Sequence, residues 1–220
     1  MGLLDNLLAY YKLQGNSNDE VSAQNGTDYS PTYSTGNGKI GQGAGFPGGN
    51  DSKGIALPIH LNGDFTINLW VKIPSFNATR WIVSYWASPY ALLVYSNASG
   101  NKISVQMNGS GDFPTGSLSN DTWYMLTLKR VGSTGYVYVN ATLANSLSGL
   151  SSIGTVTQNL RIGNSSEGTN AGDQFYGALD EIGVWERGIS DSEISDLYAG
   201  GSALQYPFGS TPANNSKMFL

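Results

Sequence analysis

Hydrophobic and polar residues alternate in short runs along most of the chain, a pattern typical of β-strands that bury one face. Residues 65–73 and 123–131 are clear examples. Asn-Gly pairs and segments rich in Asn and Ser separate the runs, and these residues favour tight turns. The predicted strands are residues 8–13, 39–46, 65–73, 81–86, 91–95, 102–107, 123–131, 135–141, 159–163 and 175–185. This spacing predicts two antiparallel sheets packed face to face.

A different pattern follows the last predicted strand, residues 175–185. Ser190 and Glu193 have the spacing of a capping box, which marks the start of a helix. Apolar residues at helical spacing come next, and Gly200 with Gly201 ends the segment. The sequence therefore predicts one short C-terminal helix.

Two neighbouring acidic residues, Asp180 and Glu181, lie inside the strand predicted over residues 175–185. Side chains of adjacent strand residues point to opposite faces, so we expect these two carboxylates to lie apart and not to act as a pair. Alternation places Asp180 on the same face as Ile182 and Val184. A carboxyl group on such an apolar face must be hydrogen-bonded, protonated or bound to a cation.

The amino-acid composition of the chain excludes several classes of function. Glycine is frequent, at 29 of 220 residues, charged residues make up only 12%, and the net charge is −5. A nucleic-acid groove needs clustered Lys and Arg, so we expect no nucleic-acid partner. No apolar run reaches the roughly 18 residues of a transmembrane helix, so we expect no membrane insertion. Cysteine is absent, which excludes disulfides, thiolate metal sites and a cysteine nucleophile.

Five segments, in order along the chain, are similar to successive strands of one family. They are residues 8–21, 41–46, 65–72, 123–130 and 175–198. This ordered set resembles the laminin-G-like jelly-roll domains of the concanavalin A-like lectin/glucanase superfamily, of the stand-alone type seen in phage structural proteins. The resemblance implies an all-β fold, a two-sheet antiparallel jelly-roll β-sandwich with one short C-terminal helix. We expect this domain to span residues 1–201, and the Pro-, Ser- and Asn-rich residues 202–220 to form an irregular tail and candidate docking arm.

The resemblance also implies a structural calcium ion. Many family members bind it between the first Asn/Asp-rich loop and the last long strand, and the matching positions here are Asp19, Asn25 and Asp180. Carboxylate, amide and carbonyl oxygens are the ligands that calcium prefers. The alternative is that the Asn residues shape Asx turns and that Asp180 accepts hydrogen bonds.

Aromatic residues gather between residues 81 and 95 and suggest a sugar-binding surface. They are Trp81, Tyr85, Trp86, Tyr90 and Tyr95. Most fall at patterned strand positions and are expected to pack in the core. Trp86 and Tyr90 are the candidates for exposed, glycan-binding rings.

The sequence contains few residues that could form a catalytic site. His60 is the only histidine, and no G-x-S-x-G motif accompanies it. The glucanases of this superfamily place two Glu on one strand, two residues apart, and this chain contains no E-x-E spacing. We therefore expect a protein that is not an enzyme.

Three functional classes follow, in order of preference. The first is a non-enzymatic virion component, a phage capsid decoration or tail protein made in the host cytoplasm. It would dock on other virion proteins or on copies of itself and bind host-surface glycans. The second is a carbohydrate-binding module of a bacterial cell-surface or extracellular system. The third, a glycan-cleaving enzyme, is disfavoured by the missing carboxylate pair.

Overall fold

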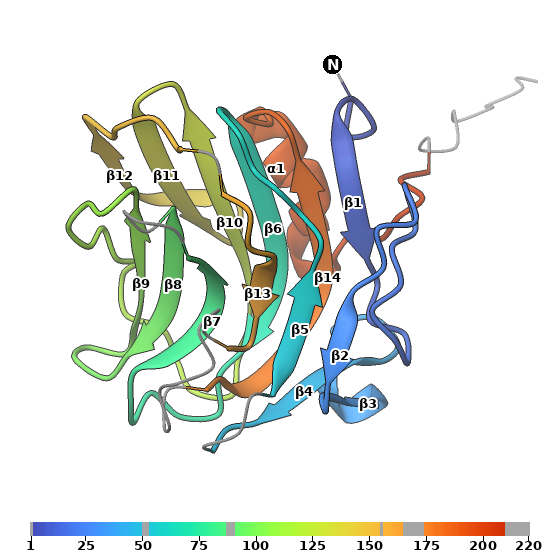
Figure 1. The fold of residues 1–220 in the computed structure, drawn as a ribbon. Helices are drawn as coiled ribbons and strands as arrows, with labels where there is room; N and C mark the ends of the chain where they lie inside the picture. Colours follow the sequence, from blue (N-terminus) through green and yellow to red (C-terminus); the bar gives the residue numbers. More distant parts are fainter. Residues whose placement is uncertain (1, 50–52, 87–90, 155, 165–173, 210–220) are drawn as a thin grey trace, which may run out of the picture.

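A computed structural model describes residues 2–49, 53–86, 91–154, 156–164 and 174–209. Within these ranges, strands β1 to β14 form two antiparallel sheets packed face to face, and one α-helix, α1 (Asp191–Tyr198), lies outside them (Figure 1). The predicted all-β jelly-roll sandwich with one short C-terminal helix is confirmed. Among the described residues, no helix has the length and apolar content needed to cross a membrane.

The larger sheet has eight strands in the order β12-β11-β10-β6-β14-β4-β3, with β1 also paired to β14. They are β1 (Leu7–Tyr11), β3 (Thr32–Ser34), β4 (Gly43–Pro47), β6 (Phe65–Lys72), β10 (Trp123–Val131), β11 (Thr134–Val139), β12 (Thr142–Ser148) and β14 (Tyr176–Trp185). Two strands share one edge of β14: β4 pairs with its first residues and β1 with its last. They diverge at Asp180 and Glu181.

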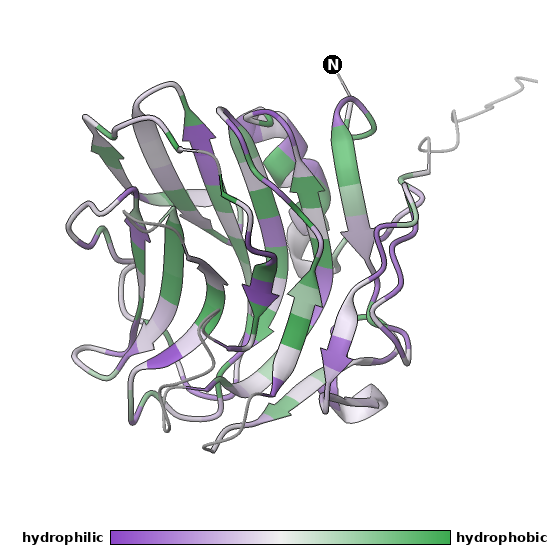
Figure 2. Cartoon of the chain, viewed as in Figure 1, coloured by the Kyte–Doolittle hydropathy of each residue, from purple (hydrophilic) through white to green (hydrophobic). Residues whose placement is uncertain are grey.

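The smaller sheet has six strands in the order β2-β5-β13-β7-β8-β9. They are β2 (Thr27–Tyr29), β5 (Gly54–Leu57), β7 (Arg80–Tyr85), β8 (Leu92–Asn97), β9 (Lys102–Met107) and β13 (Leu160–Ile162). Apolar positions recur along β5 and β6, which lie in opposite sheets (Figure 2). Ile55 and Leu57 of β5 and Ile67 and Leu69 of β6 are buried in the core between the sheets.

A second apolar cluster covers part of the outer face of the larger sheet. Trp70 of β6 and Trp185 of β14 pack there with Ile194 and Leu197 of α1 and with Leu3 of the N-terminal turn. Both indole side chains are buried. The helix therefore covers one end of this sheet face.

The sequence located most strands, two of them to the residue: β9 and β10 have the predicted bounds. The sequence pattern missed four strands, β2, β3, β5 and β12. Strands β2, β3 and β12 are short or mainly polar and exposed, and β5 begins at a glycine. The strand predicted over residues 39–46 starts too early. Strand β4 begins at Gly43, and its pairing with β14 begins at Ala44. Lys39 and Ile40 instead donate their backbone N–H groups to the Asp180 side chain.

The predicted alternation of β14 is also wrong after Asp180. The register with β6 shifts between Asp180 and Gly183, and Glu181 has a φ of 50°. Such a bulge adds one residue and turns the following side chains to the other face. Leu179 and Ile182 both face the inter-sheet core as a result.

Because of the bulge, Glu181 lies on the same outer face as Asp180. Asp180 lies opposite Trp70 of the outer cluster, and directly opposed residues share a face. The Glu181 carboxylate accepts a hydrogen bond from Tyr10, whose ring packs on Phe208 in the same outer layer. The expectation that the two acids lie on opposite faces is therefore wrong.

The capping box at the start of α1 is confirmed. Ser190 Oγ accepts a hydrogen bond from the Glu193 backbone N–H at 3.2 Å, and the Glu193 carboxylate accepts one from the Ser190 backbone N–H at 2.7 Å. The same carboxylate binds both terminal nitrogens of Arg187. The paired Arg187 guanidinium also donates to the Gly2 and Asp5 carbonyls, so it ties the N-terminal turn to the helix.

We predict that Glu193→Gln destabilises the fold in a pH-dependent way. Hydrogen bonds from Arg187 lower the pKa of Glu193 to about 2, although burial opposes the shift. Because this is below the unfolded value of about 4.3, the carboxylate stabilises the fold above pH 4 or so, and this stabilisation is lost as the pH falls toward 2. Urea unfolding at neutral pH should show a loss of about 2–3 kcal/mol.

The difference between wild type and Glu193→Gln should shrink as the pH approaches 2. Glu186→Gln, which changes an exposed carboxylate in the same connection, is the matched control and should stay within about 0.5 kcal/mol of wild type. A loss for Glu193→Gln that is equally large at all pH values would contradict the assigned ion pair.

Candidate functional site

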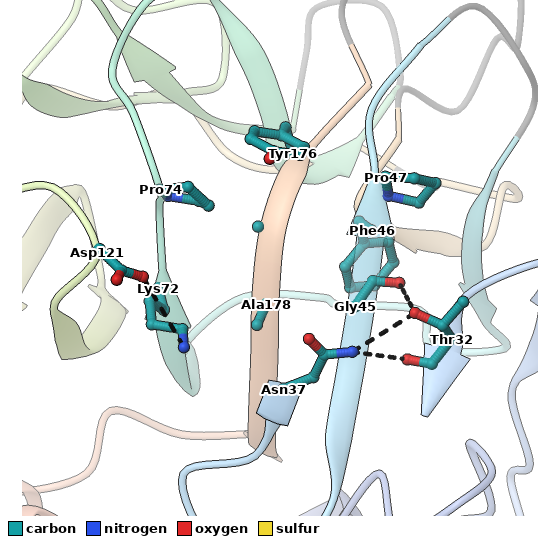
Figure 3. Close-up of a pocket in the computed structure, with 11 residues that line it drawn as sticks. Thr32, Asn37, Gly45, Phe46, Pro47, Lys72, Pro74, Asp121, Tyr176 and Ala178 are labelled. Atoms are coloured by element: carbon teal, nitrogen blue, oxygen red, sulfur yellow. Dashed lines mark hydrogen bonds and ion pairs between the residues drawn. The ribbon is translucent and has the colours of Figure 1, made fainter. Parts of the chain in front are cut away.

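An open pocket of about 220 Å³ lies on the outer face of the larger sheet, where β4, β14 and β6 run side by side (Figure 3). It is at the opposite end of β14 from the helix, because Tyr176 begins the strand and Trp185 ends it. Its floor consists of small residues, Gly45, Gly177 and Ala178. The sheet backbone is therefore accessible from this side.

The strand register explains how the pocket forms. Tyr176 lies opposite Pro47, and Ala178 lies between Gly45 of β4 and Lys72 of β6, so these side chains share the outer face. A Cβ atom on Gly45 would lie 2.2 Å from the amide nitrogen of Asn37 and 2.8 Å from Thr32 Oγ1. Glycine is needed here because both polar side chains cross directly over the strand.

An exposed aromatic ring forms the upper rim of the pocket. Tyr176 is 43% exposed, and its side chain lies between Pro74 and Pro47 in Figure 3. Tyrosine combines an apolar ring with a polar hydroxyl group, which suits a partly exposed position. The ring is thus available to stack on a ligand.

Two opposite charges lie at the side of the pocket. Lys72 Nζ is 3.9 Å from an Asp121 carboxylate oxygen and also donates to the Gly36 carbonyl at 3.4 Å. The same ammonium lies over the Trp123 ring, 5.4 Å from its centroid. Because the Asp121 side chain is 75% exposed, the pair is weak and its groups can turn to a ligand.

Asn37 supplies an amide to the pocket. Its nitrogen donates to the Thr32 carbonyl at 3.3 Å and to Thr32 Oγ1 at 3.5 Å. Figure 3 shows the amide oxygen turned away from Thr32, and among the described residues none donates a hydrogen bond to it. An aromatic ring, an amide, a carboxylate and an ammonium together suit a small ligand that has both an apolar face and hydroxyl groups.

Of the sequence-predicted metal ligands, Asp19 and Asn25 do lie together. The Asn25 side-chain oxygen accepts the Asp19 backbone N–H at 2.9 Å. The Asp19 carboxylate itself accepts hydrogen bonds from the loop and from β1, whose donors are Tyr10 N, Val21 N, Ser22 N, Ser22 Oγ and Gln24 N. Burial raises the pKa of Asp19, but these hydrogen bonds outweigh it and the pKa is lowered.

Asp180 is held by a different segment. One carboxylate oxygen accepts the N–H groups of Lys39 and Ile40 at 2.7 and 2.9 Å. The other oxygen is buried and has no hydrogen-bond partner among the described residues. Burial raises the pKa of Asp180 to about 8, and the neighbouring charge of Glu181 acts in the same direction. No described hydrogen bond joins Asp180 to Asp19 or Asn25.

Glu181 is an anchor that sequence reasoning missed. Its carboxylate accepts hydrogen bonds from Tyr10 Oη at 2.6 Å and from the Gln205 side chain. Burial raises the pKa of Glu181 to about 7, although both hydrogen bonds act to lower it. The strand pattern carried no signal of this role, because it placed Glu181 on the wrong face.

The structure holds the three predicted calcium ligands in two separate hydrogen-bonded groups, Asp19 with Asn25 and Asp180 with residues 39 and 40. Calcium takes about six to eight oxygen ligands. The oxygens of Asp19 and Asn25 already accept backbone hydrogen bonds, and only one oxygen of Asp180 has no described partner. Within the described ranges, no group of three or more His, Cys, Asp or Glu is placed to hold a metal. The calcium site stays a prediction.

Of the predicted glycan-binding pair, Trp86 is not among the residues that line the pocket. Trp86 is half-buried and follows β7, while Tyr90 lies outside the described residues. Trp81 of β7 packs edge-on against Tyr95 of β8, with ring centroids 5.1 Å apart. A sugar site at Trp86 and Tyr90 stays a prediction. Tyr176 was missed because its strand face was expected to pack against the protein.

The sequence profile of the concanavalin A-like lectin/glucanases superfamily matches residues 47–195 of the chain. The chain belongs to this superfamily. The match covers strands of both sheets, including β14 with its bulge, and reaches into α1. A search of curated proteins finds no significant match to the sequence.

Solved structures with the same fold come from several kinds of protein. Domain 4 of the extracellular GH43 arabinanase AbnA from Geobacillus stearothermophilus, in complex with arabinotriose, has a TM-score of 0.69 and 19% identity. That comparison covers 87% of this chain and 97% of the domain. The binding domain of Paraclostridial Mosquitocidal Protein 1 gives a TM-score of 0.72 and 18% identity, with 90% and 52% covered.

A Trypanosoma rangeli sialidase has a TM-score of 0.74 and 15% identity, over 92% of this chain. The chain spans only 34% of that sialidase. At these identities the three likenesses establish the fold and nothing about activity.

We predict that Asp180 acts as a hydrogen-bond anchor independent of calcium. Asp180→Ala leaves two backbone N–H groups near β14 without an acceptor and should cost about 2–4 kcal/mol of unfolding free energy. With a pKa of about 8 the carboxyl group is largely protonated at pH 7, so the neutral Asp180→Asn should cost about 1 kcal/mol or less. Neither calcium nor a chelator should change the melting temperature, and a calcium-dependent rise that Asp180→Asn abolishes would contradict this.

Proposed function

We propose that the protein is a non-enzymatic carbohydrate-binding domain and that the pocket in Figure 3 binds a sugar. The observation that carries the proposal is the exposed Tyr176 ring above a floor of small residues, with polar side chains at its side. The ring is exposed and not packed in the core, and it lies beside hydrogen-bonding side chains.

The chemistry of the pocket matches that of a sugar ring. The apolar C–H face of a sugar can stack on Tyr176, while Asn37 and Asp121 accept hydrogen bonds from its hydroxyl groups. Lys72 donates hydrogen bonds and offsets the charge of Asp121. Because the pocket carries one charge of each sign, it suits an uncharged sugar better than an acidic one.

The named relatives agree with this function. One is a domain of an arabinanase in complex with an oligosaccharide, and another is called the binding domain of its protein. Both share the fold of this chain at low identity, so they support a binding role without identifying the ligand.

The carboxylates of the structure support binding rather than cleavage. Glycosidases generally place two carboxyl groups on either side of the bond they break. Among the described lining residues of the pocket, Asp121 is the only acid. Asp180 and Glu181 are buried and already accept hydrogen bonds from the protein.

The predicted virion role, with its virion partners and location, stays a prediction. The fold is compatible with it, but the relatives named above belong to an arabinanase, a mosquitocidal protein and a sialidase. A glycan-binding domain would suit either a virus particle or a bacterial extracellular system.

We predict that Tyr176→Ala weakens glycan binding at least about tenfold, which corresponds to about 1.4 kcal/mol. The ring is exposed, so the melting temperature should change little. A glycan array followed by calorimetry on the best sugar measures the effect. Tyr29→Ala, at a similarly exposed tyrosine of the smaller sheet, is the matched control and should bind as wild type does.

Trp86→Ala in the same assay tests the site predicted from the sequence. Loss of binding in Trp86→Ala with full binding in Tyr176→Ala would move the site away from the pocket.

A second prediction concerns the pocket floor. Gly45→Ala places a methyl group where the Asn37 side chain lies, so Asn37 must move and binding should fall about tenfold or more. Gly111→Ala, at an exposed glycine with no heavy atom within 4 Å of the added carbon, controls for the substitution itself. Unchanged sugar affinity in Gly45→Ala, with the fold intact, would remove Asn37 from the site.

A further inference from the structure

The two ends of the described chain meet beside α1. Trp185 Nε1 donates to the Leu3 carbonyl at 2.7 Å, and Leu204 N donates to the Leu197 carbonyl at 3.0 Å. Phe208 stacks on Trp185 with ring centroids 6.3 Å apart. The segment after the helix therefore packs on the same outer face as the N-terminal turn.

A groove of about 1020 Å³ runs between these segments. Its walls are the N-terminal turn, the end of α1 and residues 204–209. Leu4, Leu204 and Phe208 give it an apolar surface, and the Leu4 side chain is 60% exposed. Leu4 therefore adds exposed apolar surface to a groove that Leu204 and Phe208 also line.

The charges of the groove have one sign. Asp5 and Asp196 lie among its described lining residues, and these include no Lys, Arg or His. The matching ligand is a peptide that carries a cation next to large apolar side chains.

Such a peptide follows in the same chain. Gly209 lines the groove and is the last described residue before 210–220. Within that segment, Lys217 is the one cation, and Met218, Phe219 and Leu220 follow it directly. We propose that residues 217–220 bind in this groove of their own chain, with the apolar side chains against Leu4 and the Lys217 ammonium toward Asp5 and Asp196.

The connection is long enough for this return. Residues 210–216 separate Gly209 from Lys217, and a chain of that length spans about 23 Å when extended. Pro212 and the Asn residues at 214 and 215 favour a turn. Because the segment is tethered at the groove, its effective concentration is about millimolar, so even weak intrinsic affinity fills the site. This inference is independent of the proposed sugar pocket.

Cross-linking in the full chain tests the proposal. The sequence contains no cysteine, so Leu4→Cys combined with Leu220→Cys introduces the only two thiols. Mild oxidation of dilute protein should form a disulfide within one chain at least about fivefold faster than in Ser148→Cys with Leu220→Cys. Ser148 is exposed in β12, four strands away from β14 in the sheet order, so it is the matched control.

Each other outcome overturns the proposal. Covalent dimers in place of an internal disulfide would assign the groove to the tail of a second copy. Cross-linking no faster than in the control would show that the segment does not bind there.

Thiol alkylation gives a second measurement. In Leu4→Cys alone, the reaction should be slowed by the bound segment and should speed up about threefold or more when Met218→Ser and Phe219→Ser are added. Ala213→Ser, in the same segment but outside the apolar residues, should leave the rate unchanged. An equal rate in all three proteins would contradict the proposal.

Discussion

The fold depends on how one edge of β14 is shared between two strands. β4 and β1 each need the hydrogen-bonding groups of that edge, and they diverge at Asp180. At that point the Asp180 carboxyl group accepts hydrogen bonds from the backbone N–H groups of Lys39 and Ile40. These two residues precede β4 and are not paired with a strand. A buried side chain thus replaces the missing strand partner, as buried backbone groups require.

The bulge next to Asp180 links this junction to the outer layer. By inserting one residue, it keeps Leu179 and Ile182 in the core and turns Glu181 outward, where Tyr10 and Gln205 bind it. The first strand and the segment after the helix are therefore held by one carboxylate. Both acids therefore connect segments of the fold that are far apart in the sequence.

Structural features that depend on residues close together in the chain could be predicted from the sequence, and features that depend on distant residues could not. The capping box of α1 and the bounds of β10 depend on residues close together in the chain. The bulge depends on register with β6, which alternation cannot reveal. The pocket was missed for a related reason: a strand pattern defines the two faces but does not show that α1 covers only one end of the outer face and leaves Tyr176 open.

The position of the pocket relative to the chain ends decides how accessible the pocket is when the domain is attached to another structure. Tyr176 and Trp185 begin and end β14, so the pocket and the contacts of Trp185 with Leu3 and Phe208 lie at opposite ends of one strand, roughly 30 Å apart. If the domain is fused or anchored through either end, that end faces its support. The pocket proposed to bind a sugar then lies at the other end of the same sheet face, away from the attached end.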